Sequence, residues 1–185
     1  MFYKAEMGSD EIIQVFNRLF RDTYRTELVG GGHEPLYQPN ANSTHNIIFR
    51  ADYAASALHE VAHWCMAGEE RRQLKDYGYW YFPEGRSPER QEEFERMEVK
   101  PQSMEWLFAS ASDVSFHVSV DNLQGAAFNP LRLRQSVHKQ ALYYRRVGLP
   151  RRAARFFEAL QAVRGSKEKV DRFWDAVESE GILPL

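Results

Sequence analysis

The chain has 185 residues, 43% hydrophobic and 14% aromatic, which is typical of one domain with a substantial apolar core. It carries 24 Lys and Arg against 26 Asp and Glu, so a formal charge of -2 excludes a strongly basic composition. The sequence shows no membrane-span or signal-peptide pattern, and the single cysteine, Cys65, has no disulfide partner in the chain. We therefore expect a soluble cytoplasmic protein with one domain over residues 1–185.

The first predicted elements are a helix and a strand separated by a polar connection. Ser9, followed by apolar residues at spacings of three and four, predicts a capped helix over residues 10–22. The glycines at 30–32 lack the Lys-Ser/Thr of a phosphate-binding loop and predict a hinge or turn. The β-branched and aromatic residues at 46–50 predict the first strand.

Two further helices are indicated by their end signals. One is expected to begin with Asp52 as its N-cap and to end near Gly68, and it is apolar on nearly all sides, as buried helices are. Ser87 and Pro88 resemble the start of the next helix, with the serine as cap. Pro101 either opens or kinks the helix that follows it.

The rest of the chain is predicted to be mostly helical. Residues 116–120 alternate weakly like a strand, and helices are expected over 131–147, 152–163 and 167–178. The fold class is therefore α+β, rich in helix, with a small sheet. We expect residues 130–185 to be the helical, basic C-terminal part of the same domain.

The sequence His59-Glu60-Val61-Ala62-His63 is an H-E-x-x-H motif inside the apolar helix. Residues four apart lie about 40° apart around a helix and roughly 6 Å apart along it, so both imidazoles can bind one metal ion. Buried imidazoles beside a buried carboxylate are costly without an ion to bind them. The alternative is a pair of core histidines with ordinary hydrogen-bond partners.

A catalytic site of this kind takes its third protein ligand from elsewhere in the chain. The candidates are acidic or histidine residues, namely Glu69, Glu70, Glu98, Glu105, His33, His45 and His117. Glu98 is favoured over Glu105, and with Gln102 these two share one helix face unless Pro101 breaks the helix. Gln102 and Glu105 are then either polar neighbours that orient the ligands or, for Glu105, the alternative ligand.

The ligand pattern alone does not identify the metal. With Zn2+, Glu60 acts as the general base of a peptidase or amidase. With Fe2+, two histidines and one carboxylate leave an open face at which dioxygen binds. Spacing alone favours zinc, because Zn2+ binds such ligands more tightly than Fe2+ does.

Four longer blocks of the sequence are rich in aromatic residues or surround the candidate ligands. They are HEVAHWC at 59–65, DYGYWY at 76–81, EVKPQ at 98–102 and VSVDNL at 118–123. Together they resemble the bacterial elongation factor P hydroxylase family over nearly the whole chain. The resemblance implies a non-haem iron monooxygenase that hydroxylates the β-lysylated lysine side chain of elongation factor P. Dioxygen is the implied cosubstrate, and the sequence does not identify the reductant.

The resemblance also assigns roles to residues. It makes His59, His63 and Glu98 the metal ligands, in a zincin-like arrangement with the motif on a buried helix, and it overrides the zinc-first interpretation. Glu60, catalytic in the zinc alternative, is then expected to orient a histidine or to hold the ligand helix. The aromatic residues Tyr77, Tyr79, Trp80 and Tyr81 are expected either to wall a substrate pocket or to belong to the core. Glu105 or Asp121 is a candidate partner for the substrate ammonium groups.

A basic run follows Pro130. It contains no Asp or Glu and comprises Arg132, Arg134, Lys139, Arg145, Arg146, Arg151, Arg152 and Arg155. Such a run predicts a positive face, and a metal-containing RNA-binding module is the non-enzymatic alternative. Because elongation factor P is acidic as a family, we expect Arg145, Arg146, Arg151 and Arg152 to dock that protein. Binding to membranes or directly to nucleic acid is not expected.

Overall fold

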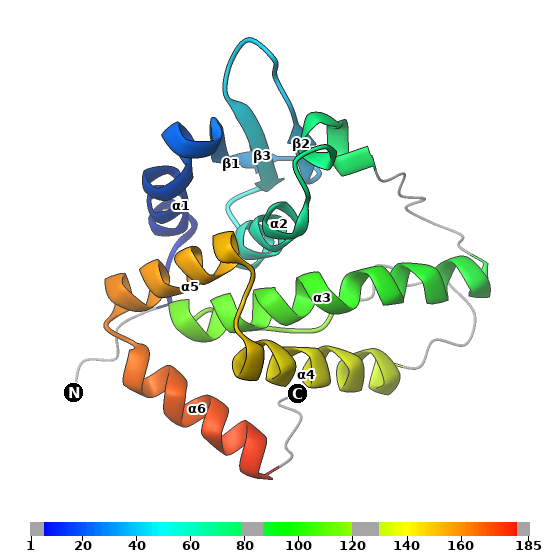
Figure 1. The fold of residues 1–185 in the computed structure, drawn as a ribbon, viewed down its shortest axis with the longest axis vertical. Helices are drawn as coiled ribbons and strands as arrows, with labels where there is room; N and C mark the ends of the chain where they lie inside the picture. Colours follow the sequence, from blue (N-terminus) through cyan, green and yellow to red (C-terminus); the bar gives the residue numbers. More distant parts are fainter. Residues whose placement is uncertain (1–5, 79–86, 120–129, 181–185) are drawn as a thin grey trace.

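The computed structural model describes residues 6–78, 87–119 and 130–180, and it is rich in helix with one small sheet (Figure 1). Its elements are α1 (Ser9–Tyr24), β1 (Thr26–Gly32), β2 (Leu36–Gln38), β3 (His45–Arg50), α2 (Ala54–Met66), the 3-10 turns η1 (Arg71–Gln73) and η2 (Lys75–Gly78), α3 (Pro88–Ser112), α4 (Pro130–Val147), α5 (Arg151–Arg164) and α6 (Lys167–Glu180). The predicted α+β class, with a small sheet and the H-E-x-x-H motif on a buried helix, is confirmed.

The sheet has the strand order β1-β3-β2, with β3 parallel to β1 and antiparallel to β2. The prediction of a turn at residues 30–32 is wrong, because these glycines form the end of β1. An added Cβ would lie 2.9 Å from the Phe49 ring at Gly30 and 2.8 Å from the Ile48 side chain at Gly32. Glycine is thus required there by side chains of the neighbouring strand and not by a turn.

Helix α2 lies between the sheet and α3 (Figure 1). Its residues Ala57, Leu58, Val61 and Trp64 are completely buried, as the apolar pattern predicts. The predicted cap is wrong by one residue, since Tyr53 occupies the N-cap position instead of Asp52. The polar link at this end is a hydrogen bond of 3.1 Å from the Arg50 N–H to the Ser56 hydroxyl.

Helix α3 continues through Pro101 without a break. Its start is as predicted, because Ser87 caps it by accepting a hydrogen bond from the Arg90 N–H. Proline has no N–H, so the carbonyl of Met97 loses its usual helical donor. Packing against α2, α4, α5 and α6 holds the helix together across this point. Glu98, Gln102 and Glu105 therefore do share one face.

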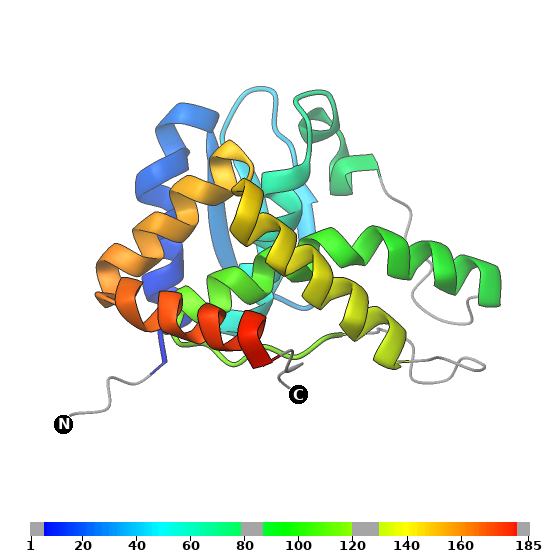
Figure 2. The ribbon, with the colours of Figure 1, turned by 60° about the horizontal axis from the view of Figure 1, so that its bottom comes forward.

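The three C-terminal helices follow the predicted ranges closely and pack against α3, and α5 also packs against α1 and α2 (Figure 2). Leu133 and Val137 of α4, Phe156 of α5 and Trp174 of α6 are buried in the same core cluster as α2 and the sheet. The weak strand expected at 116–120 is absent over the described residues 116–119. None of the helices in the described ranges is both long and apolar enough to cross a membrane.

Candidate metal centre

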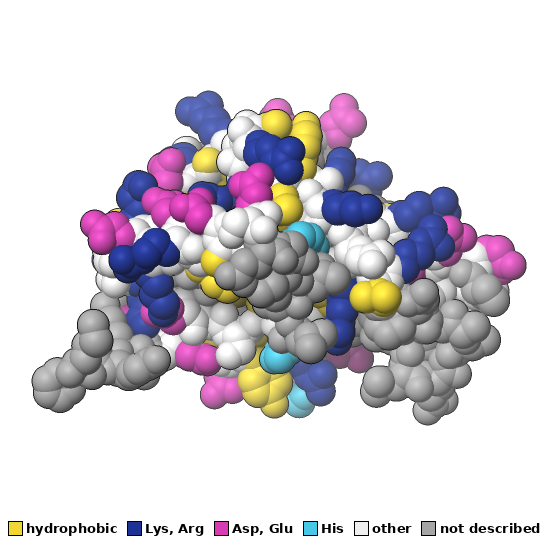
Figure 3. All heavy atoms as spheres, turned by 90° about the horizontal axis from the view of Figure 1, so that it is seen from below, with side chains coloured by type: hydrophobic (Ala, Val, Ile, Leu, Met, Phe, Trp, Pro, Cys, Tyr) yellow, Lys and Arg dark blue, Asp and Glu magenta, His cyan; other side chains and the backbone are white. Residues whose placement is uncertain are grey.

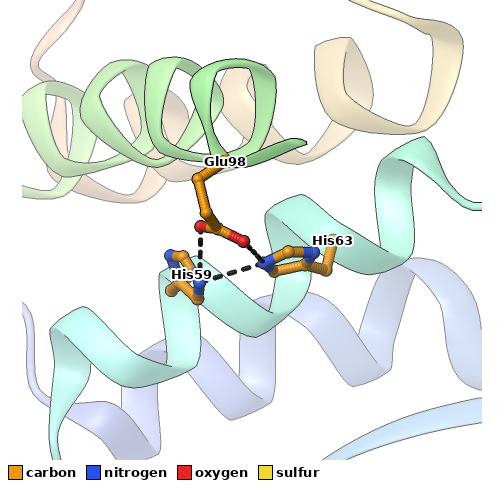
Figure 4. Close-up of side chains that lie close together, drawn as sticks. All are labelled: His59, His63 and Glu98. Atoms are coloured by element: carbon orange, nitrogen blue, oxygen red, sulfur yellow. Dashed lines mark hydrogen bonds and ion pairs between the residues drawn. The ribbon is translucent and has the colours of Figure 1, made fainter. Parts of the chain in front are cut away.

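Two imidazoles and one carboxylate converge where α2 faces α3 (Figure 4). The Nε2 atoms of His59 and His63 are 3.0 Å apart. Glu98 reaches them from α3, with Oε2 at 3.6 Å from His59 Nε2 and Oε1 at 3.4 Å from His63 Nε2. One ligand atom from each residue lies within 4.8 Å of the others, which places three donors around a common point. This is the three-residue donor set expected from the sequence.

Glu105 lies beside this set and contacts the far side of one imidazole. Its Oε2 atom is 2.8 Å from His59 Nδ1. If His59 carries its proton on Nδ1, it donates to this carboxylate and leaves the Nε2 lone pair directed toward Glu98 and His63. Glu105 is thus placed to orient a ligand, and it is outside the three-residue cluster.

Gln102 holds the carboxylate in place. Its Nε2 group donates to Glu98 Oε2 at 3.3 Å and to the Ser119 carbonyl at 2.8 Å. The Ser119 N–H donates in turn to Gln102 Oε1 at 3.1 Å. All polar atoms of this buried amide are therefore engaged at once, which fixes its orientation toward Glu98. Ser119 holds Gln102 through its main-chain N–H and carbonyl, so its side-chain type gave no signal of this role.

Opposite charges stabilise the cluster when no ion is bound. Burial by itself lowers the pKa of His59, but the charge and hydrogen bond of Glu105, with the charges of Glu98 and Glu60, raise it to about 10. Burial by itself raises the pKa of Glu98, but the two imidazoles and Gln102 lower it to about 2. The ion-free centre is therefore a protonated imidazole against carboxylates, and a cation replaces that proton when it binds.

Glu60 is not part of the three-residue set, although its carboxyl group interacts electrostatically with all three members. Burial raises the pKa of its carboxyl group, against the charges of His59 and His63. The neighbouring Tyr77 is buried, stacks on Tyr37 with ring centroids 4.3 Å apart, and has no hydrogen-bond partner for its hydroxyl among the described residues. Tyr77 thus belongs to the core cluster, and its role as a wall of the substrate pocket stays a prediction. Tyr79, Trp80, Tyr81 and Asp121 lie outside the described residues.

The basic residues expected to dock a partner have different surroundings. Arg145 pairs with Asp171 at 3.4 Å and Arg146 with Glu178 at 3.3 Å, so acids of α6 partly neutralise the face that the basic run predicts. Seen from below, basic and acidic side chains are mixed over the molecule (Figure 3). Arg151 is exposed at the start of α5.

Arg152 joins the start of α5 to the C-terminal end of α2. Its Nη2 group donates to the carbonyls of Trp64, Cys65 and Ala67 at 3.0, 3.0 and 2.6 Å, at the C-terminal end of α2. Its guanidinium also lies over the Trp64 ring at 4.7 Å. This engagement leaves Arg152 poorly available to a partner, which differs from the docking role expected from the sequence. The basic run in the sequence indicates the charge of Arg152 but not its hydrogen bonds to the carbonyls of α2.

Comparison with known proteins decides the family. The model of the family described as Elongation factor P hydroxylase matches residues 15–173. The chain belongs to this family. It is also 44% identical over 164 residues to the Elongation factor P lysine hydroxylase of Haemophilus influenzae. This alignment covers 88% of this chain and 92% of that protein. The family match extends over both ligand helices, α2 and α3, and over most of the C-terminal helices.

Proposed function

We propose that this protein hydroxylates the β-lysylated lysine side chain of elongation factor P at an iron centre held by His59, His63 and Glu98. The observation that carries the proposal is the convergence of these three side chains in a chain of the elongation factor P hydroxylase family. Family membership favours this chemistry over the zinc peptidase or amidase that the motif alone suggests. Modification of a translation factor also suggests a cytoplasmic protein.

The donor set fits Fe2+. Two imidazole nitrogens and one carboxylate, held on two helices, are the ligands of many non-haem iron oxygenases and leave other positions open. Bound iron would supply the activation of dioxygen needed to oxidise an unactivated C–H bond, which no side chain provides. His59 is 24% exposed and His63 is 13% exposed, so the ligand set is reachable from outside while Glu98 is buried.

The chain's own residues hold this centre in its geometry. Glu105 fixes the ring orientation of His59, and Gln102 fixes the carboxylate of Glu98. Such neighbours of metal ligands typically change metal affinity by about 10–100-fold when they are removed. Glu60 is placed to support α2 from the side of Tyr77 and has no assigned step in the hydroxylation.

The test is the intact mass of lysylated elongation factor P after co-expression with this protein, together with metal analysis of the purified protein. We expect a gain of about 16 Da, the mass of one oxygen atom, and bound iron. His59→Ala should abolish both, whereas His33→Ala, an exposed histidine outside the centre, should leave both unchanged. Zinc in place of iron with no mass change would contradict the proposal.

Glu60 separates the hydroxylase from the zinc alternative. In a hydrolase, Glu60→Gln removes the general base and abolishes activity. In the proposed hydroxylase, the three ligands are unchanged and Glu60→Gln retains substantial oxygen addition. Loss of all activity with full iron content would count against the proposed role of Glu60.

We also propose that the basic residues Arg145, Arg146 and Arg151 steer association with the acidic protein substrate. Charge reversal at these positions should slow association and weaken its dependence on salt. Stopped-flow binding at two salt concentrations measures both effects. Unchanged association kinetics would exclude this docking surface.

A further inference from the structure

A cleft of about 950 Å3 lies between the C-terminal end of α2 and the middle of α3. His63, Met66 and the turn after α2 form one side, and Met97 and Pro101 of α3 form the other. Because His63 belongs to the ligand set and also lines the cleft, the cleft leads to the metal centre. None of the roles assigned above uses this space.

The two sides of the cleft present exposed apolar side chains. Met66 is 37% exposed and Met97 is 40% exposed, although each stands next to well-buried neighbours on its helix. Methionine is unbranched and adaptable, and exposed methionines are common on surfaces that bind flexible apolar chains. Facing methionines beside a reaction centre therefore suit an aliphatic chain.

Glu69 and Glu70 give the cleft a net negative charge, since Arg71 is the one arginine or lysine among the described residues that also line it. Both are exposed and line it, and neither forms an ion pair with another residue of the described ranges. The adjacent arginines donate to main-chain carbonyls, Arg71 to Tyr77 at 3.2 Å and Arg72 to Ala67 at 2.8 Å. The two carboxylates still outnumber the lining Arg71, which favours a cationic ligand.

Pro101 adds apolar surface to the side of the cleft that Met97 forms. The cleft therefore combines apolar sides with a net negative charge, which is the complement of an aliphatic ammonium.

We propose that this cleft binds the modified side chain of the substrate, with Glu69 and Glu70 pairing with its ammonium groups. The inference rests on the proposed function. A β-lysylated lysine is a long aliphatic chain with one amide link and two ammonium groups. Met66 and Met97 contact its methylene segments, and the two carboxylates match its two charges. The His63 end of the cleft brings part of the chain to the metal centre.

The test is steady-state hydroxylation of lysylated elongation factor P by iron-loaded protein. The variant Glu69→Gln/Glu70→Gln should raise KM about tenfold and leave kcat within about twofold of wild type. Glu69→Asp/Glu70→Asp keeps the charges and should have a KM close to that of wild type. The control Glu158→Gln/Glu168→Gln removes two exposed charges from α5 and α6 and should leave KM unchanged. Iron content and unfolding temperature should equal wild type in all variants.

The outcomes separate this inference from the proposed function. If wild type adds one oxygen and the Gln variant keeps a wild-type KM, the cleft assignment is overturned and the hydroxylase function stands. An equal rise of KM in the control, a fall in kcat alone, or loss of iron from the Gln variant also overturns it. If wild type adds no oxygen to lysylated elongation factor P, the proposed function itself is contradicted.

Discussion

Replacement of Arg152 by alanine should destabilise the fold, because this residue binds the C-terminal end of the ligand helix. Its Nη2 group carries two protons, so about two of the three carbonyl contacts are satisfied at once, each worth about 1.5 kcal/mol as a charge-assisted hydrogen bond. The contact with the Trp64 ring adds about 0.5–1 kcal/mol. We therefore expect a loss of about 3–4 kcal/mol, or about 10 °C in Tm for a chain of this size.

Urea unfolding followed by tryptophan fluorescence measures this loss. Arg151→Ala is the matched control, since Arg151 is adjacent to Arg152 and exposed. This substitution should change the free energy of unfolding by at most about 0.5 kcal/mol. Arg152→Lys should recover only part of the loss, because an ammonium group does not reproduce the planar contacts. If Arg152→Ala unfolds at the same urea concentration as Arg151→Ala, the capping role is refuted and Arg152 is again a candidate for docking.

Three further predictions concern the metal centre and the core. Glu105→Ala should weaken metal binding about 10–100-fold, by freeing the His59 ring, in a chelator competition assay. Burial raises the pKa of Asp113, but Lys169 and Arg164 lower it below its usual value of 3.8, so its ion pairs stabilise the fold above that pH and are lost as the pH falls below it. Asp113→Asn should therefore cost about 2 kcal/mol at pH 6 and less at pH 3, as measured by denaturant unfolding; an equal cost at both pH values would contradict this. Cys65 is 4% exposed and burial raises its pKa to about 12, so iodoacetamide should modify it only in unfolded protein, as mass spectrometry would report.

Local periodicity predicted the part of the site that depends on one helix. The spacing of His59 and His63 fixes their common direction, and the shared face of Glu98, Gln102 and Glu105 follows from the same geometry once the helix continues. The sequence alone does not decide whether Pro101 interrupts the helix between Glu98 and Gln102. Packing of α3 against four other helices resolved it, and such packing is not encoded in any short segment.

Long-range contacts account for the predictions that were wrong. Gly30 and Gly32 have the composition of a turn, but side chains of β3 lie against them, and their pairing becomes visible only in the folded sheet. The basic run likewise gave no sign of the acids that oppose it. Asp171 and Glu178 lie outside the run and reach Arg145 and Arg146 only because α6 packs nearby. The basic run in the sequence therefore predicted a more positive surface than the folded protein has at Arg145 and Arg146.

The packing of α3 has a consequence for shortened versions of the chain. This helix of 25 residues packs against α2 on the side that carries Glu98, and it also packs against α4, α5 and α6. Deleting residues 130–180 would expose apolar residues of α3, among them Trp106, which packs on Trp174, and Phe108, which packs on Phe156. A fragment that retains all three ligands is therefore expected to aggregate before it binds a metal ion. The C-terminal helices are a structural part of the metal centre, although none of their side chains belongs to the three-residue ligand set.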